Sequence, residues 1–339
     1  MLCNQPMSRR SLPSPTVLNL ICGHWSWGCW SSSVRNASRS RFCGALHMDQ
    51  PLLNKALAAI QRKHVFQPQV ALILGSGLGE LAEGLDHGRQ IPYADIPGFH
   101  PPGVSGHAGT LALGYLSGVP VVVFSGRCHR YEGYTTAQVQ FPVRVAWALG
   151  AETLLATNAA GGLNPRFLAG DLMVIDSHIN LLWERGGRVA RSAGDNQSEA
   201  EFNANHSVDS VPRPFQRHEP FYSPNWIARA HRCAVRCGLR LQQGTYVATL
   251  GPTYETRAEY KMFREIGGDA AGMSTAPEAI VARSLGMEVA AFSVITNVAS
   301  PDTPHSTDHG EVVDWAHRAG PRLASLIKSM LNEVAGQPD

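Results

Sequence analysis

Short apolar runs alternate with helical patterns along most of the chain. The runs at residues 70–75, 110–125, 153–162 and 288–297 are rich in valine, isoleucine, leucine and alanine. Such runs are typical of strands buried on both faces, and the amphipathic segments between them are typical of helices that cover a sheet. The alternation predicts an α/β architecture with a largely parallel or mixed sheet. The 339 residues contain no internal repeat and no linker that would divide the chain.

The first 47 residues differ from the rest of the sequence. They hold five arginines and four of the seven cysteines, but neither aspartate nor glutamate. An arginine- and serine-rich end without acidic residues can be a targeting peptide, yet no apolar core with a cleavage site follows. We therefore expect residues 1–47 to be an extension that is disordered or not part of the natural protein. Residues 48–335 are expected to form one domain.

Composition argues against several classes of function. Charged residues make up 17% of the chain and the net charge is +2, without the concentrated basic face of nucleic-acid-binding proteins. No apolar run reaches the ~18 residues of a membrane span. The cysteines after residue 47, Cys128, Cys233 and Cys237, lack partners at zinc-ligand spacing. We expect free thiols, a reducing compartment and a cytoplasmic location, with no nucleic-acid or membrane partner.

The sequence VALILGSGLGE at residues 70–80 joins a predicted strand to a glycine turn and the start of a helix. A dinucleotide-binding loop needs glycine at position 80, and a Walker loop needs Gly-Lys-Ser/Thr at 80–82. The sequence has Glu-Leu-Ala there, so both nucleotide-binding interpretations fail. What remains is either a plain strand-to-helix turn or a turn whose N–H groups, with the Ser76 hydroxyl, bind a small anion.

A second motif, SGRCHRYEGY, carries Arg127, His129 and Tyr131 at alternating positions. In an extended segment these side chains point to the same side. An arginine offers a planar fork for an oxyanion, and a histidine can donate one more hydrogen bond. The tyrosine can stack on a sugar or form a hydrogen bond with it. The motif therefore predicts an anion site beside a sugar site, or else a surface strand with ordinary polar residues.

Five further motifs place small or polar residues beside predicted strands and turns. They contribute His107 in GHAG, Ala159 in TNAAGG, Tyr254 and Glu255 in GPTYET, Met273 and Ser274 in GMSTAPE, and Thr296 and Asn297 in ITN. Ligands of open α/β sheets bind outside the carboxyl ends of the strands, which makes these residues candidates for a site. Each motif taken alone also has a purely structural interpretation.

Together these residues provide donors for a phosphate, a tyrosine and a methionine for a sugar, and a glutamate and an asparagine for the edge of a heterocycle. GMSTA has alanine where a nucleophile elbow needs its last glycine, so Ser274 is not interpreted as an acyl-transfer nucleophile. The sequence shows no metal-ligand set and no catalytic triad. We therefore expect a substrate that brings its own nucleophile, and inorganic phosphate fits that role.

Nine motifs, taken in their order along the chain, resemble those of the trimeric purine nucleoside phosphorylases that prefer 6-oxopurines. They are GSGLG, GHAG, GRCHRYEGY, FPVRV, TNAAGGLNP, GDLMVIDSHINL, GTYVATLGPTYET, GMSTAPEAIVAR and ITN, and they span roughly residues 52–331. The resemblance implies a single α/β domain with a mixed central sheet that is partly closed into a barrel and flanked by helices. It also implies a homotrimer with active sites near the subunit interfaces.

The resemblance assigns roles to individual residues. It implies a phosphate site of Ser76, His107, Arg127, His129, Ala159 and Ser274. It implies nucleoside contacts from Tyr131, Tyr254, Glu255, Met273, Thr296, Asn297 and His309, with His129, Asn297 and Glu255 as the catalytic residues. Tyr254 stands where phenylalanine is common. His305 competes with His309 for the 5′-hydroxyl, and Phe215 is the candidate that closes the site of a neighbouring subunit.

The implied reaction is reversible phosphorolysis of purine ribo- and deoxyribonucleosides, with phosphate as nucleophile and neither metal nor organic cofactor. An N1–H exists only on 6-oxopurines, so Glu255 as its acceptor favours these over adenosine. Two alternatives stay open. A methylthioadenosine phosphorylase is expected to carry aspartate at position 297, where the chain has Asn297. A non-catalytic nucleoside-binding protein would not need Arg127, His129 and Ser274 together.

Overall fold

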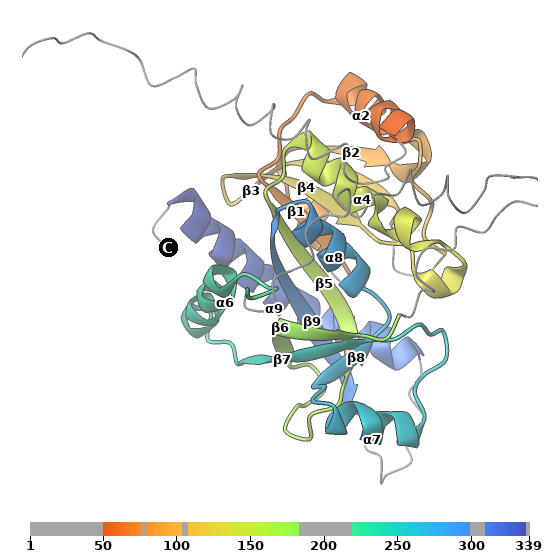
Figure 1. Ribbon diagram of the computed structural model, residues 1–339. Helices are drawn as coiled ribbons and strands as arrows, with labels where there is room; N and C mark the ends of the chain where they lie inside the picture. Colours follow the sequence, from red (N-terminus) through yellow and green to blue (C-terminus); the bar gives the residue numbers. More distant parts are fainter. Residues whose placement is uncertain (1–49, 76–78, 104–107, 183–218, 299–308, 337–339) are drawn as a thin grey trace, which may run out of the picture. The chain divides into compact units, whose positions relative to one another are not determined.

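The computed structural model describes residues 50–75, 79–103, 108–182, 219–298 and 309–336. Within them, helices and strands alternate as the sequence pattern predicts (Figure 1). The strands are β1 (Val70–Leu74), β2 (Asp86–Pro92), β3 (Thr110–Leu116), β4 (Val119–Ser125), β5 (Thr153–Gly162), β6 (Leu172–Asn180), β7 (Leu241–Ala248), β8 (Ala270–Gly272) and β9 (Glu288–Val298). The helices are α2 (Gln50–Lys63), α3 (Glu80–Glu83), α4 (Thr136–Leu149), α6 (Pro224–Arg236), α7 (Arg257–Glu265), α8 (Ala276–Ser284) and α9 (His309–Ala335), with 3-10 turns η1 (Tyr93–Asp95) and η2 (Arg130–Glu132).

The described strands form one mixed sheet of nine, in the order β2-β3-β4-β1-β5-β8-β7-β6-β9. Strand β5 also pairs with β9, and this pairing closes β5, β8, β7, β6 and β9 into a barrel. Strand β1 runs parallel to both β4 and β5, whereas β3 is antiparallel to β2 and β4. The predicted fold, a mixed sheet partly closed into a barrel and flanked by helices, is confirmed.

Strand β5 belongs to both parts of the sheet. Its first half lies between β1 and β9, and its last two residues, Gly161 and Gly162, pair with both β8 and β9. A strand that is hydrogen-bonded on both edges must be free of proline, and TLLATNAAGG contains none. Strand β5 therefore carries the end of the open sheet directly into the wall of the barrel.

Two features differ from the sequence pattern. The helix predicted to start at Glu80 is a single turn, since α3 ends at Glu83 and β2 begins at Asp86. Strand β2 has no apolar pattern because it lies at the edge of the sheet with most of its residues exposed. An edge strand needs little apolar surface, and periodicity alone does not detect it.

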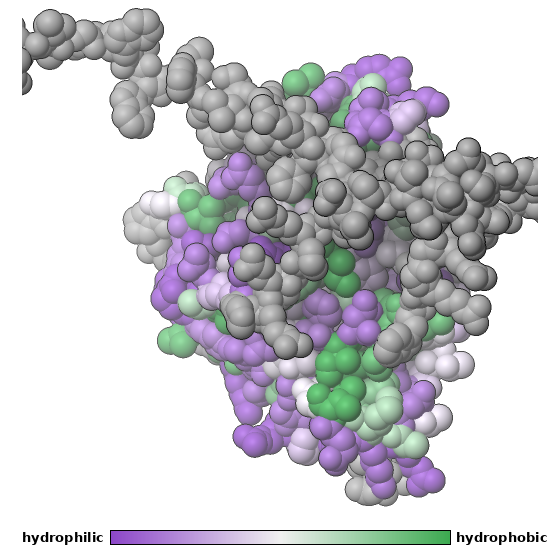
Figure 2. All heavy atoms as spheres, viewed as in Figure 1, coloured by the Kyte–Doolittle hydropathy of each residue, from purple (hydrophilic) through white to green (hydrophobic). Residues whose placement is uncertain are grey.

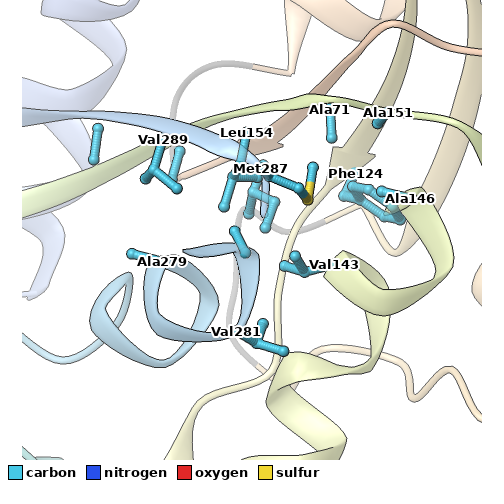
Figure 3. Close-up of a cluster of buried hydrophobic side chains, with 14 of the residues drawn as sticks. Ala71, Phe124, Val143, Ala146, Ala151, Leu154, Ala279, Val281, Met287 and Val289 are labelled. Carbon is cyan, nitrogen blue, oxygen red and sulfur yellow. The ribbon is translucent and has the colours of Figure 1, made fainter. Parts of the chain in front are cut away.

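The core lies on both faces of the sheet. On β1, Ala71 and Ile73 pack in a cluster with residues of α2, α4 and α8, whereas Val70, Leu72 and Leu74 join residues of α6 and α9. This alternation follows from the two-residue period of a strand. Figure 3 shows part of the first cluster, in which Leu154 and Met287 contribute beside side chains of α4 and α8.

The face shown in Figure 2 is mostly hydrophilic, with smaller hydrophobic patches among the polar side chains. Scattered apolar exposure of this kind is ordinary for a folded protein. Among the helices that the structure describes, none is long and apolar enough to cross a membrane. Among the described residues, Cys128, Cys233 and Cys237 form no disulfide bond.

Leu154→Ala tests the buried face of β5. Leu154 is 0% exposed, and removing its side chain leaves a cavity that neighbouring residues fill only in part. We expect a loss of about 2–5 kcal/mol in the free energy of unfolding, measured by urea denaturation. Leu168→Ala is the matched control, because Leu168 is 62% exposed and the same deletion there should cost less than about 0.5 kcal/mol. Equal effects of the two changes would contradict the assigned core.

Candidate active site

A cleft of about 810 Å³, including its open mouth, lies where β5, β9 and the segment after β8 come together. It is lined by Gly75, Arg127, His129, Tyr131, Asn158, Ala159, Ala160, Gly161, Tyr254, Glu255, Tyr260, Ala271, Gly272, Met273, Ser274, Thr296, Asn297 and Val312. Segments far apart in the sequence thus contribute to one concave surface.

Most of the candidate residues lie in this cleft. Ten of them line it: Arg127, His129, Tyr131, Ala159, Tyr254, Glu255, Met273, Ser274, Thr296 and Asn297. Ser76, His107, Phe215 and His305 lie outside the described residues. His309 is the first residue of α9, and its side chain lies outside the description.

Arg127 provides a buried positive charge at one part of the cleft. It follows β4 and is only 5% exposed. Its Nη2 donates to the carbonyl oxygens of Thr157 and, at 3.4 Å, of Ile73. Its Nη1 donates to Thr275 Oγ1 at 3.2 Å and lies 3.2 Å from Glu278 Oε1. The guanidinium group is therefore held from β1, β5 and α8 at once.

Thr275 joins the neighbouring groups into a network. Its Oγ1 also accepts a hydrogen bond from Asn158 Nδ2 at 2.9 Å, and it lies 3.3 Å from Ser274 Oγ. Its backbone φ is 68°, a left-handed value that β-branched residues rarely adopt. Strained backbone of this kind is concentrated at functional sites, where the surrounding contacts hold it in place.

His129 is oriented by Glu132. Its Nδ1 lies 2.8 Å from Glu132 Oε1, and since a carboxylate accepts, the ring donates from Nδ1. The backbone N–H of His129 donates to the same oxygen at 2.8 Å. Burial lowers the pKa of the His129 imidazole below its ordinary value, and the hydrogen bond to Glu132 partly opposes that shift. The ring is therefore neutral at pH 7, with its Nε2 as an acceptor.

Tyr131 reaches the cleft by a different backbone path from the one predicted. The extended segment ends at His129, and Tyr131 lies in the 3-10 turn η2. The turn stacks the tyrosine ring on the His129 ring, with centroids 4.9 Å apart and an angle of 13° between the planes. All three alternating residues face the cleft, but the reason for Tyr131 is this turn and not a strand.

A carboxylate occupies another part of the cleft. Glu255 Oε1 accepts a hydrogen bond from Thr249 Oγ1 at 2.9 Å, and Tyr260 also forms a side-chain hydrogen bond with Glu255. Burial and the nearby Glu255 raise the pKa of Tyr260 to about 12, so the phenol remains protonated and can donate. Tyr254 lies beside them and is 43% exposed, which leaves an aromatic face open to a ligand.

Thr296 and Asn297 both line the cleft although they are neighbours in a strand. Successive side chains of a regular strand point to opposite faces. The register of β9 against β5 shifts here, since Ala160 pairs with Ile295 and Gly161 pairs with Asn297. Such a bulge redirects side chains and is common beside active sites. Thr296 Oγ1 lies 3.2 Å from Asn297 Oδ1 and 3.4 Å from the carbonyl oxygen of Ala160, so this hydroxyl links the Asn297 amide to β5.

Gly161 and Gly162 differ in how closely β9 approaches them. A Cβ atom at Gly161 would lie at ordinary contact distance from the Asn297 amide, 3.4 Å from Oδ1 and 3.5 Å from Nδ2. At the second glycine of the pair, Gly162, there is less space for a side chain, because a Cβ there would approach Ile295 Cγ2 to 2.9 Å. The small residues of TNAAGG therefore allow β9 and its amide to lie close against β5.

Sequence reasoning missed the residues that hold the candidates in place. These are Glu132, Asn158, Thr249, Tyr260, Thr275 and Glu278. Two signals were available: Glu132 follows His129 by three residues, and Thr275 and Glu278 have the spacing of a capping box. The partner of Asn158 comes from a distant segment, so no local pattern identifies it, whereas Thr249 is only six residues from its partner Glu255. Among the described residues, no group of three or more histidine, cysteine, aspartate or glutamate side chains could hold a metal ion.

Comparisons with known proteins agree with this architecture. Residues 69–332 match the family model described as the phosphorylase superfamily. The purine nucleoside phosphorylase 1 of Geobacillus stearothermophilus is 42% identical over 288 residues, which cover 85% of this chain and 99% of that protein. The purine nucleoside phosphorylase of Mus musculus is 42% identical over 276 residues, covering 81% of this chain and 91% of that one.

A solved structure of schistosoma purine nucleoside phosphorylase in complex with hypoxanthine superposes with a TM-score of 0.71 at 32% identity, covering 85% of this chain and 97% of that chain. A structure of the Schistosoma mansoni protein in complex with adenosine matches equally well, with the same score, identity and coverage. The fold is thus that of the phosphorylase superfamily. Within it, the chain belongs to the purine nucleoside phosphorylase family.

The titration of His129 tests the geometry of the anion site. We expect its ring proton signals, followed by NMR and assigned with a His129→Asn spectrum, to titrate below the ordinary pKa of 6.5. Glu132→Gln should lower the pKa further, because it removes a carboxylate that favours the charged ring. Glu259→Gln is the control and should leave the pKa of His129 unchanged. A higher pKa in Glu132→Gln would contradict the assigned contact.

Proposed function

We propose that the protein catalyses the reversible phosphorolysis of purine nucleosides, with 6-oxopurines preferred, to the free base and ribose or deoxyribose 1-phosphate, as a step of purine salvage. The observation that carries this proposal is the cleft, in which side chains that can bind an anion lie together with a carboxylate and an amide. Two different groups of binding side chains in one cleft suit an enzyme with two substrates. The relatives named above carry the same activity in their names.

Inorganic phosphate would bind beside Arg127, His129 and Ser274. A guanidinium group forms strong, charge-assisted hydrogen bonds with phosphate oxygens. Helix α8 starts directly after Ser274 and Thr275, and a helix N-terminus favours an anion. The neutral His129 ring would accept the O–H of hydrogen phosphate at Nε2. The resemblance to the family adds Ser76, His107 and the backbone of Ala159 to this site.

The nucleoside would occupy the rest of the cleft. Tyr131 and Met273 would contact the ribose, and His309 would meet the 5′-hydroxyl. Glu255 would accept from the purine N1–H, and Thr296, Asn297 and Tyr254 would complete the base site. The support for these roles is that, His309 apart, all of them line the cleft. Phe215 of a neighbouring subunit is the candidate that closes the sugar side.

The chemistry is displacement at the anomeric carbon. The glycosidic bond breaks early, so positive charge develops on the sugar beside the phosphate dianion and negative charge moves onto the purine. Asn297 can donate a hydrogen bond to N7 or O6 of the purine, where that negative charge develops. Donors already held in place by the fold stabilise a transition state without reorganising, and removing one costs about 10²–10³ in kcat.

Assembly and location complete the proposal. We assign the activity to residues 48–335, which contain the matched segment 69–332. The resemblance to trimeric enzymes supports a homotrimer, and the free thiols support a reducing, cytoplasmic location. Because phosphate supplies the nucleophile, the reaction as proposed uses neither a metal nor an organic cofactor.

Dependence on phosphate is the decisive test of this function. Inosine is incubated with the protein with and without inorganic phosphate, and hypoxanthine and ribose 1-phosphate are measured. We expect release of base only when phosphate is present, and formation of ribose 1-phosphate in equal amount. Cleavage that continues without phosphate would identify a hydrolase. Nucleoside binding without any cleavage would identify a non-catalytic binding protein.

Asn297→Asp tests the base site and the alternative of a methylthioadenosine phosphorylase. A carboxylate repels the 6-oxo group and N7 of hypoxanthine, but it can accept from a 6-amino group. We expect the ratio of kcat/KM for adenosine to that for inosine to rise by about tenfold or more, equivalent to about 1.4 kcal/mol. Asn164→Asp, outside the residues that line the cleft, is the control. An unchanged ratio would remove Asn297 from the base site.

A further inference from the structure

Three described helices begin with the same signature, a threonine followed three residues later by glutamine or glutamate. In α4 the pair is Thr135 and Gln138, and in α7 it is Thr256 and Glu259. Both pairs form a capping box, in which each side chain bonds the other residue's backbone N–H. The third pair, Thr275 and Glu278 at the start of α8, has the same spacing, so sequence alone predicts a third capping box.

Helix α8 does not form this capping box. Thr275 makes no side-chain cap, and its φ of 68° is far from the extended values of −70° and −72° at Thr135 and Thr256. Its Oγ1 accepts instead from Arg127 Nη1 at 3.2 Å. The carboxylate of Glu278 is turned away from the helix end and lies 3.2 Å from the same Nη1. Both capping side chains of α8 are therefore directed at Arg127.

This arrangement does not serve the stability of α8. A non-glycine residue at positive φ costs on the order of 1–3 kcal/mol, and the end of the helix loses its side-chain cap. Glu278 is 1% exposed, and its carboxylate oxygens have no aligned hydrogen-bond donor among the described residues. A buried ion pair rarely offsets the cost of its own desolvation. Departures from local rules that bring no stability are expected at functional sites.

We propose that Glu278, together with Thr275, is the positioning residue of the phosphate site, acting through Arg127. The proposal rests on the function given above for the cleft. Without an internal carboxylate, the buried guanidinium group would be an uncompensated charge whenever phosphate is absent, and it would turn toward other acceptors. Glu278 and Thr275 hold Nη1 while the carbonyl oxygens of Thr157 and Ile73 hold Nη2. The plane of the group is thus set before phosphate arrives.

Glu278→Gln is the main test, since it keeps the size of the side chain and removes its charge. We expect the KM for phosphate to rise about tenfold to a hundredfold, as for a displaced binding group, while the KM for inosine changes less than about twofold. Calorimetric titration with inorganic phosphate alone should show the same loss of affinity. Glu259→Gln makes the same change in a working capping box and should leave the KM for phosphate unchanged.

A double-mutant cycle separates positioning from a general structural effect. In an Arg127→Met background, Glu278→Gln should cause no further loss of phosphate use, because the group it positions is gone. Glu278→Asp, which keeps the charge on a shorter side chain, should bind phosphate with an affinity between those of the wild type and Glu278→Gln. It also keeps the test decisive if Glu278→Gln fails to fold.

The possible outcomes distinguish this proposal from the function on which it rests. A wild-type protein that neither binds nor uses phosphate overturns both. If the wild type uses phosphate, three results for Glu278→Gln overturn the positioning role alone. The variant has an unchanged KM for phosphate, or it binds phosphate more tightly, or its affinity for inosine falls as much as its affinity for phosphate. An effect of Glu278→Gln that persists in full in the Arg127→Met background does the same.

Discussion

The buried positive charge of Arg127 is the constraint on which the site depends. A guanidinium group cannot lose its proton at physiological pH, so a position 5% exposed must supply acceptors for it. These acceptors come from the end of β1, the middle of β5 and the start of α8. The three elements can meet only if β1 and β5 are parallel neighbours and α8 returns to their carboxyl ends. The charge that we propose for binding phosphate thus also links β1, β5 and α8.

Strand β5 connects the two parts of the cleft, because it contacts residues in both. Its first half receives Arg127 and its second half supports the Asn297 amide. The bulge opposite Ala160 and Gly161 lets two consecutive residues of β9 face the same cleft. The side chains that we propose for binding phosphate and those that we propose for binding the base are therefore both held against β5. Such an arrangement suits a reaction that needs both substrates in a fixed relative position.

Much of the fold and many candidate residues could be predicted from the sequence because their signals are local. Apolar runs identified β1, β4, β5 and β9. The polar edge strand β2 was missed, since its exposed residues have no apolar period. The long-range supporting contacts were missed for another reason: the hydrogen bond from Asn158 to Thr275 spans 117 residues, so no local pattern signals it. Ser274 was singled out, whereas Thr275 and Glu278 beside it were not.

The sequence by itself determined the alternation of strands and helices, the resemblance to a family and the residue types available for chemistry. These properties follow from side-chain periodicity and from short motifs, which a linear chain carries without its fold. Only the tertiary structure decided that Thr275 and Glu278 leave their helix cap for Arg127, and that Thr296 and Asn297 share a face. The physical reason is that a buried charge needs partners, and a paired strand needs a register, that residues far away in the sequence supply. These long-range contacts override the local preferences for a capping box and for a regular strand.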